Sequence, residues 1–95
     1  MDKTFILFVT YHAKPDCRES FVRFLEDSGA ASLVRAEDGC IRYDYYLSTS
    51  DPNEVLLFEE WESKEKQEIH MTQPHIALIK EAKEKYIIDA SLRVL

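Results

Sequence analysis

Four segments of the chain alternate with a period of two, and we predict them to be β-strands because successive strand side chains point to opposite faces. They are residues 3–13, 40–48, 54–62 and 87–95. In the first segment both faces are apolar in the middle, with Leu7 and Val9 on one side and Ile6 and Phe8 on the other. A strand with one face in water would alternate cleanly between apolar and polar residues, so we expect this strand to be covered on both faces.

The stretch after the first strand has the periodicity of a helix. Pro15 and Asp16 suit a first helical turn, and an apolar stripe follows at Cys17, Phe21, Phe24, Leu25 and Ser28. We do not expect Gly29 to end this helix, because the residues after it tolerate helix and an interior glycine costs only about 1 kcal/mol relative to alanine. The helix is expected to stop at Asp38-Gly39.

Two further helices are predicted between the third and fourth strands. Ser63 is a good N-cap residue, and Glu65 lies in the first turn, where a negative charge interacts favourably with the helix dipole. Pro74 ends this short helix and suits the beginning of the next one. The second helix has an inner apolar stripe of Ile76, Ile79, Ala82 and Tyr86.

The element order β-α-β-β-α-α-β predicts a ferredoxin-like α+β fold, with one domain over residues 1–95, an antiparallel sheet and helices on one face. The helices can cover only that one face. An apolar sheet face of several hundred Å² is unusual on a monomer. We therefore expect the second face to pack against the same face of another copy, in a two-fold homodimer.

The charge balance narrows the range of partners. The 95 residues include 18 acidic and 12 basic side chains, a formal net charge of −6, which disfavours nucleic acid and anionic membranes as partners. The apolar run from Phe5 to Val9 is too short to cross a membrane, and no small-residue cleavage site follows it. Cys17 and Cys40 are therefore expected to be reduced thiols in the cytoplasm.

His70 is the leading candidate for catalysis. The end of the third strand and the ends of two helices should bring Trp61, His70 and His75 together, with Glu59 on the same strand face as the tryptophan. An imidazole titrates near neutral pH, so His70 could accept a phenolic or enolic proton, or it could simply cap its helix or hydrogen-bond to the third strand. His75, behind Pro74, is more readily interpreted as structural.

A metal site is not expected from the histidines. His70 and His75 are separated by a helix break and do not share a helical face, and His12 would have to supply a third ligand from a distant part of the chain.

Aromatic residues and one acid complete the candidate site. Trp61, Tyr11 and Tyr43 could line a flat pocket, although a single aromatic residue at strand spacing is more often part of the core. Glu59 has apolar neighbours and must find a partner such as Arg42 or a tyrosine hydroxyl; we expect an interior ion pair rather than a free proton acceptor. The candidate substrate contacts are Trp61, Tyr43, Tyr11, His75 and Arg42.

The chain resembles the antibiotic biosynthesis monooxygenase family over about residues 3–94. The likeness lies in KPDCRESF, in DGCIRYDYYLSTSDPNEVLLFEEWES and in HMTQPHIALIKEA. Its most specific parts are Glu37-Asp38-Gly39-Cys40, Glu59-x-Trp61-Glu62 and His70-x-x-x-Pro74-His75. The resemblance implies a ferredoxin-like α+β barrel that is formed by dimerisation.

The family resemblance implies several chemistries. Several members oxidise quinols or polyphenols with molecular oxygen and no metal or flavin, others bind haem, and one group isomerises a phosphorylated autoinducer-2. Haem-degrading members carry a tryptophan at about the place of His70 and a haem-ligating histidine some ten residues later, where this chain has Lys80. We therefore expect neither haem nor another cofactor.

Three functions stay open at this point, because a family and a fold do not settle a reaction. The first is a cofactor-independent monooxygenase that acts on a small quinol or polyphenol, with His70 as the proton acceptor. The second is an isomerase of a small hydroxyketone such as a phosphorylated autoinducer-2-type compound, with Arg42 or Lys80 near the phosphate. The third is a non-catalytic dimeric module that binds an aromatic metabolite.

Overall fold

The computed structural model describes residues 3–95, which form four strands and four helices. In chain order these are β1 (Phe5–Ala13), α1 (Arg18–Asp27), α2 (Ala30–Arg35), β2 (Cys40–Leu47), β3 (Glu54–Trp61), α3 (Lys64–His70), α4 (Ile76–Tyr86) and β4 (Ile87–Val94). The four predicted strands are confirmed, with ends that shift by one or two residues. No helix among residues 3–95 is both long and apolar enough to pass through a bilayer.

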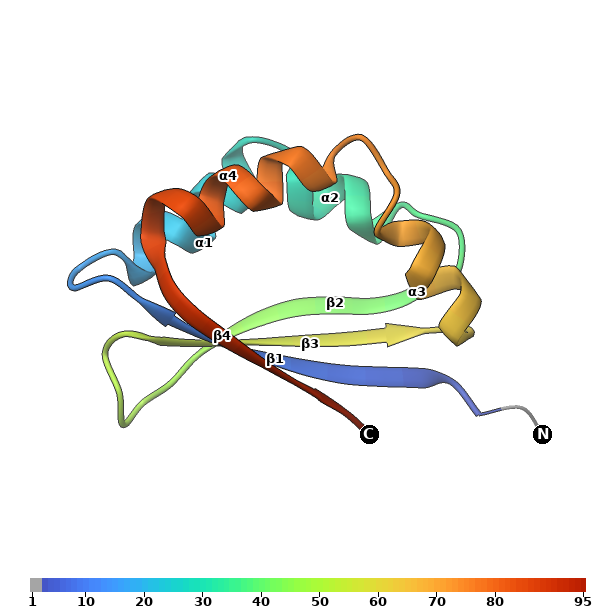
Figure 1. Cartoon of the computed structure of the whole chain (residues 1–95), viewed down its shortest axis with the longest axis horizontal. Coiled ribbons are helices and arrows are strands. Elements are labelled where there is room, and N and C mark those ends of the chain that lie inside the picture. The colour runs from blue at the N-terminus through green and yellow to red at the C-terminus, as the bar shows by residue number, and fades with distance from the viewer. Residues whose placement is uncertain (1–2) are drawn as a thin grey trace.

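The four strands form one antiparallel sheet in the order β2-β3-β1-β4. The central pair is β1 with β3, in a register that places Leu7 opposite Glu59 and Val9 opposite Leu57. Figure 1 shows the helices on one side of the sheet and the other side bare. This arrangement is the predicted ferredoxin-like α+β fold.

The core lies between the helices and the near face of the sheet. It is formed by alternate residues of the central strands and the inner stripes of the helices: Leu7, Val9, Tyr11, Phe21, Leu25, Ala30, Val34, Tyr43, Val55, Leu57, Trp61, Ile76, Ile79 and Ala82. The period of two in β1 and β3 therefore selects a buried face, as predicted. The inner stripe of α4 is also confirmed, with Ile76, Ile79 and Ala82 buried.

The first predicted helix is two helices, so the expectation at Gly29 is wrong. Gly29 has φ of 86°, a left-handed conformation that an L-residue with a side chain rarely adopts. Its N–H donates to the carbonyl of Glu26 at 3.1 Å and closes the end of α1, as glycine does at many helix C-termini. The turn redirects the chain so that Ala30 and Val34 of α2 are fully buried, and this packing outweighs the continuous helix.

The beginning of α1 also differs from the prediction. Asp16 has φ of 62°, which is outside the right-handed helical region, so Pro15 and Asp16 lie in a turn rather than in a helical turn. The helix begins at Arg18, with Cys17 as its N-cap residue.

The far face of the sheet carries half-buried apolar residues, as the sequence indicated. Phe8 of β1 and Phe58 of β3 face each other across the strand pair, with ring centroids 5.0 Å apart. Ile6, Leu56 and Tyr46 lie on the same face. No element among residues 3–95 covers these side chains (Figure 1).

Candidate functional site

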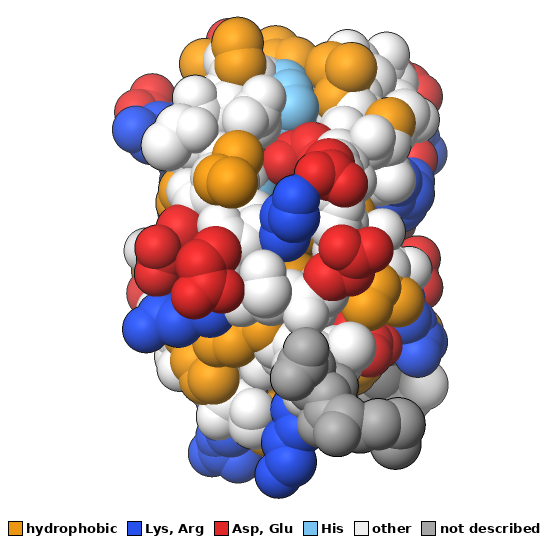
Figure 2. Space-filling view, turned by 90° about the vertical axis from the view of Figure 1, so that its right-hand side faces the viewer, with side chains coloured by type: hydrophobic (Ala, Val, Ile, Leu, Met, Phe, Trp, Pro, Cys, Tyr) orange, Lys and Arg blue, Asp and Glu red, His pale blue; other side chains and the backbone are white. Residues whose placement is uncertain are grey.

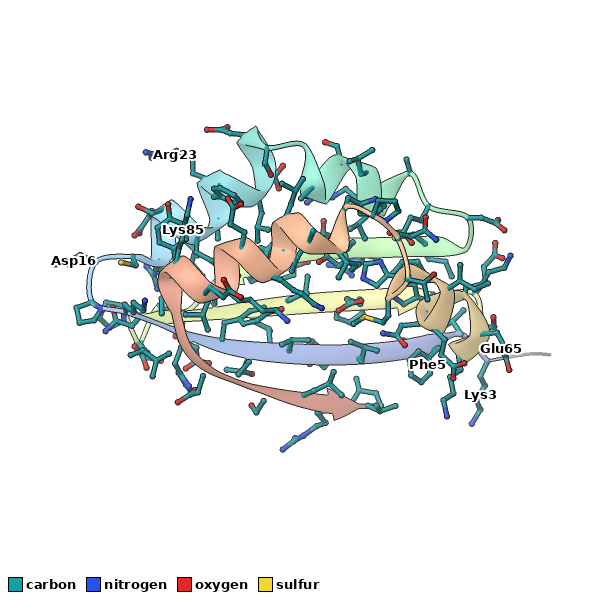
Figure 3. The ribbon with its side chains drawn as sticks, turned by 45° about the horizontal axis from the view of Figure 1, so that its top comes forward. Lys3, Phe5, Asp16, Arg23, Glu65 and Lys85 are labelled. Carbon is teal, nitrogen blue, oxygen red and sulfur yellow. The ribbon has the colours of Figure 1, made fainter. Side chains whose placement is uncertain are left out.

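The segment from Ser63 to Ile76 places two histidines beside one turn. The Ser63 hydroxyl accepts a hydrogen bond from the Lys66 N–H at 3.2 Å and begins α3 as predicted. His70 is the last residue of α3, and α4 begins at Ile76 with His75 as its N-cap residue. Figure 3 shows α3 at the end of the sheet where β1 begins, with Glu65 and Phe5 at that end and Asp16 at the other.

The carboxylate of Glu37 connects the two histidines, a role that was not expected from the sequence. Oε2 of Glu37 lies 2.7 Å from Nδ1 of His70 and 2.7 Å from Nε2 of His75. A carboxylate oxygen only accepts, so both ring nitrogens carry hydrogens that they donate to Glu37. The side chain of His70 is 4% exposed, that of Glu37 10% and that of His75 12%. Charge-assisted hydrogen bonds that are sheltered from water in this way are strong.

The turn before β2 holds Glu37 close to α3. Gly39 has φ of 89°, and a Cβ at this position would lie 2.5 Å from Cγ of Lys66 in α3. The glycine therefore allows the turn and the helix to approach each other closely. Figure 2 faces the end of the molecule where α3 lies, and only a small area of histidine side chain reaches this surface.

His70 is oriented on both sides of its ring. The ring lies 4.8 Å from the Trp61 ring, centroid to centroid, and 6.1 Å from that of Tyr43. Because Nδ1–H donates to Glu37, Nε2 carries the lone pair. Nε2 has no hydrogen-bond partner among residues 3–95 and is not sealed from its surroundings, so it is available to a ligand.

The space beside His70 is a cavity of about 230 Å³ between the sheet and the helices. Its lining is mostly apolar, with a few polar groups, which is typical of a small-molecule site. The lining residues come from the sheet and the last two helices: Val9, Tyr11, Tyr43, Leu57, Glu59, Gln67, His70, Met71, Ile76, Ile79, Lys80, Lys83, Ala90, Ser91 and Leu92.

Glu59 is a buried acid in the wall of this cavity. It is 6% exposed, and its Oε1 accepts a hydrogen bond from the Trp61 indole N–H at 3.0 Å. Burial raises the pKa of Glu59, and the Trp61 N–H, His70 and Lys83 partly oppose that increase. The expected interior ion pair is therefore wrong: the side chain two residues along the same strand face supplies the partner, and no cation among residues 3–95 hydrogen-bonds to this carboxylate.

The predicted site residues divide into two groups. His70, Tyr43 and Tyr11 line the cavity, and burial raises the pKa of both tyrosines above its ordinary value, so their hydroxyls stay protonated at neutral pH. Trp61 is fully buried and supports His70 and Glu59 from behind instead of lining the cavity. His75 bonds to Glu37 and does not line the cavity either, although it was a candidate substrate contact.

Arg42 is on the other side of the sheet, so its expected contact with substrate is wrong. Its Nε donates to Asp44 at 3.0 Å, and its guanidinium lies 4.6 Å from the centre of the Phe58 ring on the far face. The period of two in β2 separates Arg42 from Tyr43, and side chains on opposite faces of a sheet cannot reach the same cavity.

His70 and His75 lie close together in the structure, although the helix break between them was expected to keep them apart. The turn at Pro74 folds back, so donor atoms of Glu37, His70 and His75 lie within 4.8 Å of one another, although the sequence separates them. Two imidazoles and one carboxylate are a donor set that a divalent cation could share. In this structure the donors are engaged in hydrogen bonds with one another.

Comparison with known proteins identifies the class of protein to which this fold and site belong. The family model described as "Antibiotic biosynthesis monooxygenase" matches residues 4–82. The chain belongs to this family, as the motifs around Glu59, Trp61 and His70 predicted.

Individual relatives support this assignment. The curated protein named "Putative monooxygenase Rv0793", from Mycobacterium tuberculosis, is 42% identical over 62 residues, which cover 65% of this chain and 58% of that protein. The solved structure of Rv0793 from Mycobacterium tuberculosis matches with a TM-score of 0.83 and 26% identity, covering 98% of this chain and 93% of that chain. The crystal structure of PA3566 from Pseudomonas aeruginosa matches with a TM-score of 0.86 and 24% identity, covering 100% of this chain and 94% of that chain. This match shows that the two proteins share a fold.

Proposed function

We propose that this protein is a cofactor-independent monooxygenase that oxidises a small electron-rich aromatic compound, a quinol or polyphenol, with molecular oxygen. The observation that carries the proposal is the His70 imidazole, which Glu37 orients with Nε2 available beside a mostly apolar cavity. Family membership supports the same class of reaction.

The cavity suits a flat aromatic ring. At about 230 Å³ it has room for a small ring system, and Leu57 and Ile79 offer apolar contact from the sheet and from α4. Tyr11 and Tyr43 also line the cavity, and their hydroxyls stay protonated because burial raises the pKa of both. A substrate hydroxyl that donates to Nε2 of His70 would be held in one orientation.

The first chemical step is proton transfer from the substrate hydroxyl to Nε2 of His70. Glu37 stabilises the resulting imidazolium through the Nδ1–H bond at 2.7 Å. The substrate anion, in a site with little water, gives one electron to O₂, and the radical pair combines at a ring carbon to form a peroxide anion. This anion takes the proton back from His70. Loss of water from the hydroperoxide then leaves a quinone, so one oxygen atom enters the product, the other becomes water, and the substrate supplies the electrons.

The proposal includes a homodimer that buries the far face of the sheet. Ile6, Phe8, Leu56 and Phe58 leave an apolar surface there that no element among residues 3–95 covers. Two copies that pack these faces together across a two-fold axis would remove the apolar area from water. The cavity lies on the opposite face, so both sites of the dimer would stay open to substrate.

The test is oxygen uptake and quinone formation with a panel of hydroquinones, catechols and naphthols. His70→Ala is expected to lower the rate about 10²- to 10⁴-fold, as loss of a general base does. His12→Ala is the matched control, because His12 is on the far sheet face and is bonded to Asp89. Equal rates in the native protein and His70→Ala, or no turnover of any compound by the native protein, would refute the proposal.

A metal-dependent reaction is tested in the same assay. We expect the native rate to persist after dialysis against a chelator and to change little when Zn²⁺, Fe²⁺ or Mn²⁺ is added. If the rate falls on dialysis and recovers with one of these ions, then Glu37, His70 and His75 bind a metal ion in the active protein. The proposed metal-free reaction would then be refuted.

One observation favours an isomerase as the second candidate. Lys80 and Lys83 line the cavity, where their charges could bind the phosphate of a phosphorylated hydroxyketone. Product analysis without oxygen separates the two reactions, since only the isomerase would turn over. Ligand binding without turnover under either condition would indicate the non-catalytic binding module.

A further inference from the structure

Glu59 gives the cavity a second group that can accept a proton. It lines the same cavity as His70 but approaches from β3, whereas His70 comes from the end of α3. Its Oε1 is held by the Trp61 N–H at 3.0 Å. Its Oε2 has no hydrogen-bond donor among residues 3–95 and is not sealed from the cavity. One oxygen therefore fixes the carboxylate, and the other is available.

The proposed reaction includes a second removal of a proton, at a different atom of the substrate. When oxygen has added to a ring carbon, that carbon still carries its hydrogen, and the quinone forms only when this proton leaves as the O–O bond breaks. The carbon is ortho or para to the hydroxyl that His70 deprotonated, so it lies some distance along the ring from Nε2. A base at a second position on the cavity wall, such as Glu59, would serve this carbon better than His70.

We propose that Glu59 is a catalytic residue that removes the proton from the oxygenated ring carbon; this inference rests on the proposed function. The electron pair of the C–H bond becomes the second C–O bond of the new carbonyl. The O–O bond breaks at the same time and hydroxide leaves. Hydroxide then takes the proton from Glu59 and departs as water, which returns the carboxylate to its starting state.

The surroundings of Glu59 suit this role. Burial raises the pKa of Glu59 and makes its carboxylate a stronger base than an exposed one, and Glu37 acts in the same direction. His70 and Lys83 lower the pKa, and so does the Trp61 N–H, which keeps the group ionisable. Three tyrosines also interact with the Glu59 charge, Tyr11, Tyr43 and Tyr45, and their own raised pKa values keep them neutral.

A catalytic role of Glu59 limits the substrates to fewer aromatic compounds. A substrate must have a hydrogen on a ring carbon ortho or para to an ionisable hydroxyl. Analogues that carry a methyl group at each of these carbons are expected to bind and lose the hydroxyl proton, but to give no quinone.

The decisive variant is Glu59→Gln, whose amide oxygen can still accept from Trp61 but whose amide cannot remove a proton. We expect quinone formation to fall about 10²-fold. Hydrogen peroxide should be released in its place, because water displaces it from the blocked hydroperoxide and leaves a hydroxyl group on the ring carbon. Deuterium on the oxidised ring carbon should slow Glu59→Gln more than the native protein, because removal of this proton becomes rate-limiting. Glu62→Gln is the matched control, an exposed glutamate just after the same strand.

The outcomes separate the two proposals. Native rates of quinone formation in Glu59→Gln, with His70→Ala inactive, would overturn the role of Glu59 and leave the proposed function intact. No oxygen uptake by the native protein, or full activity of His70→Ala, would overturn both. A lowered rate in Glu59→Gln without peroxide release and without a larger isotope effect would show a structural role and would also overturn the inference.

An independent measurement follows the carboxyl directly. Trp61 is the single tryptophan of the chain, so its fluorescence reports on the Glu59 hydrogen bond as pH changes. Because the His70 ring lies 4.8 Å from the Trp61 ring and could also change its fluorescence, the measurement is made with His70→Ala as the background. We expect a transition above the ordinary pKa of glutamate in His70→Ala alone and in its combination with Glu62→Gln, and none in its combination with Glu59→Gln. The same transition in all three proteins would mean that Glu59 is not the group that titrates, and would contradict its role as a proton acceptor.

Discussion

The two faces of this sheet arise from the same alternation of residues along the strands, but they differ in burial and in the partners of their polar side chains. On the near face, Leu57 is almost fully buried under the helices, and the polar Glu59 and His70 have fixed partners around a cavity. On the far face, Leu56 and Phe58 are only half covered, and their neighbours are exposed charges such as Arg42. Alternation of residues along a strand therefore shows that the sheet has two different faces. It does not show which face holds the functional site.

The largest contrast is expected from a matched pair of neighbours on β3. Leu57→Ala should lower the free energy of unfolding by about 2–5 kcal/mol, because Leu57 is almost fully buried and its loss enlarges the empty space under the helices. Leu56→Ala, one residue earlier and facing the other way, should cost clearly less. Urea unfolding at one protein concentration measures both. Equal losses would contradict the assignment of the two faces.

The second effect is on self-association through the far face. Phe58→Asp puts a charge into the proposed dimer contact and is expected to weaken the dimer by at least about 30-fold, or about 2 kcal/mol, as loss of an interface hot spot does. Light scattering over a dilution series measures the mass. Glu65→Ala, on the outer surface of α3, is the control and should leave the mass unchanged. A native protein that is already monomeric at high concentration would refute the homodimer.

A smaller effect is expected on the near face from Glu37→Gln. The amide oxygen can still accept from one histidine, but the charge that stabilises the imidazolium is lost. We expect kcat to fall about 10- to 10²-fold, less than for His70→Ala, since a hydrogen bond to a charged group contributes about 1.5–3 kcal/mol. Steady-state kinetics on the best quinol of the panel gives the value. A loss as large as that of His70→Ala would show that Glu37 does more than position the ring.

The smallest effect concerns stability and pH. Folding favours the protonated form of Glu59, because burial raises its pKa. Its contribution to stability is therefore fully present below the unfolded pKa of glutamate, about 4.3, and is lost as pH rises through the raised folded value. Glu59→Gln should be slightly more stable than the native protein at pH 7, and the difference should disappear in acid.

Thermal unfolding of the two proteins between pH 4 and pH 8, with Glu62→Gln as the control, measures this difference. A Glu59→Gln protein that is less stable at pH 7 would mean that the native carboxylate has a stabilising partner.

Local rules predicted much of the fold. The strands followed from alternation, and Ser63 marked the beginning of α3 because its hydroxyl can bond the free N–H groups of a first turn. Gly29 shows the limit of the same rules. The cost of about 1 kcal/mol for glycine in a helix is small, but a break at this residue lets Ala30 and Val34 reach the core, and this gain belongs to packing and not to the local sequence.

The candidate site was predictable only in part. His70 could be singled out because few residue types titrate near neutral pH, and its place in the family motif agreed. Glu37 was not found, because it lies in a turn 33 residues before His70 and has no periodicity that assigns it a direction. The one available signal was its position at the start of the Glu37-Asp38-Gly39-Cys40 turn, which the resemblance marked as specific.

The sequence alone determined the elements, their order and the apolar character of both sheet faces, because these depend on neighbours along the chain and on the geometry of strands and helices. Only the tertiary structure decided which side chains share a cavity. The pairing of Glu37 with two histidines, the bond from Trp61 to Glu59 and the exclusion of Arg42 all follow from how the helices lie on the sheet. The physical reason is that a buried polar group takes whichever partner packing brings within hydrogen-bond distance, and residues far apart in the chain carry no local mark of that distance.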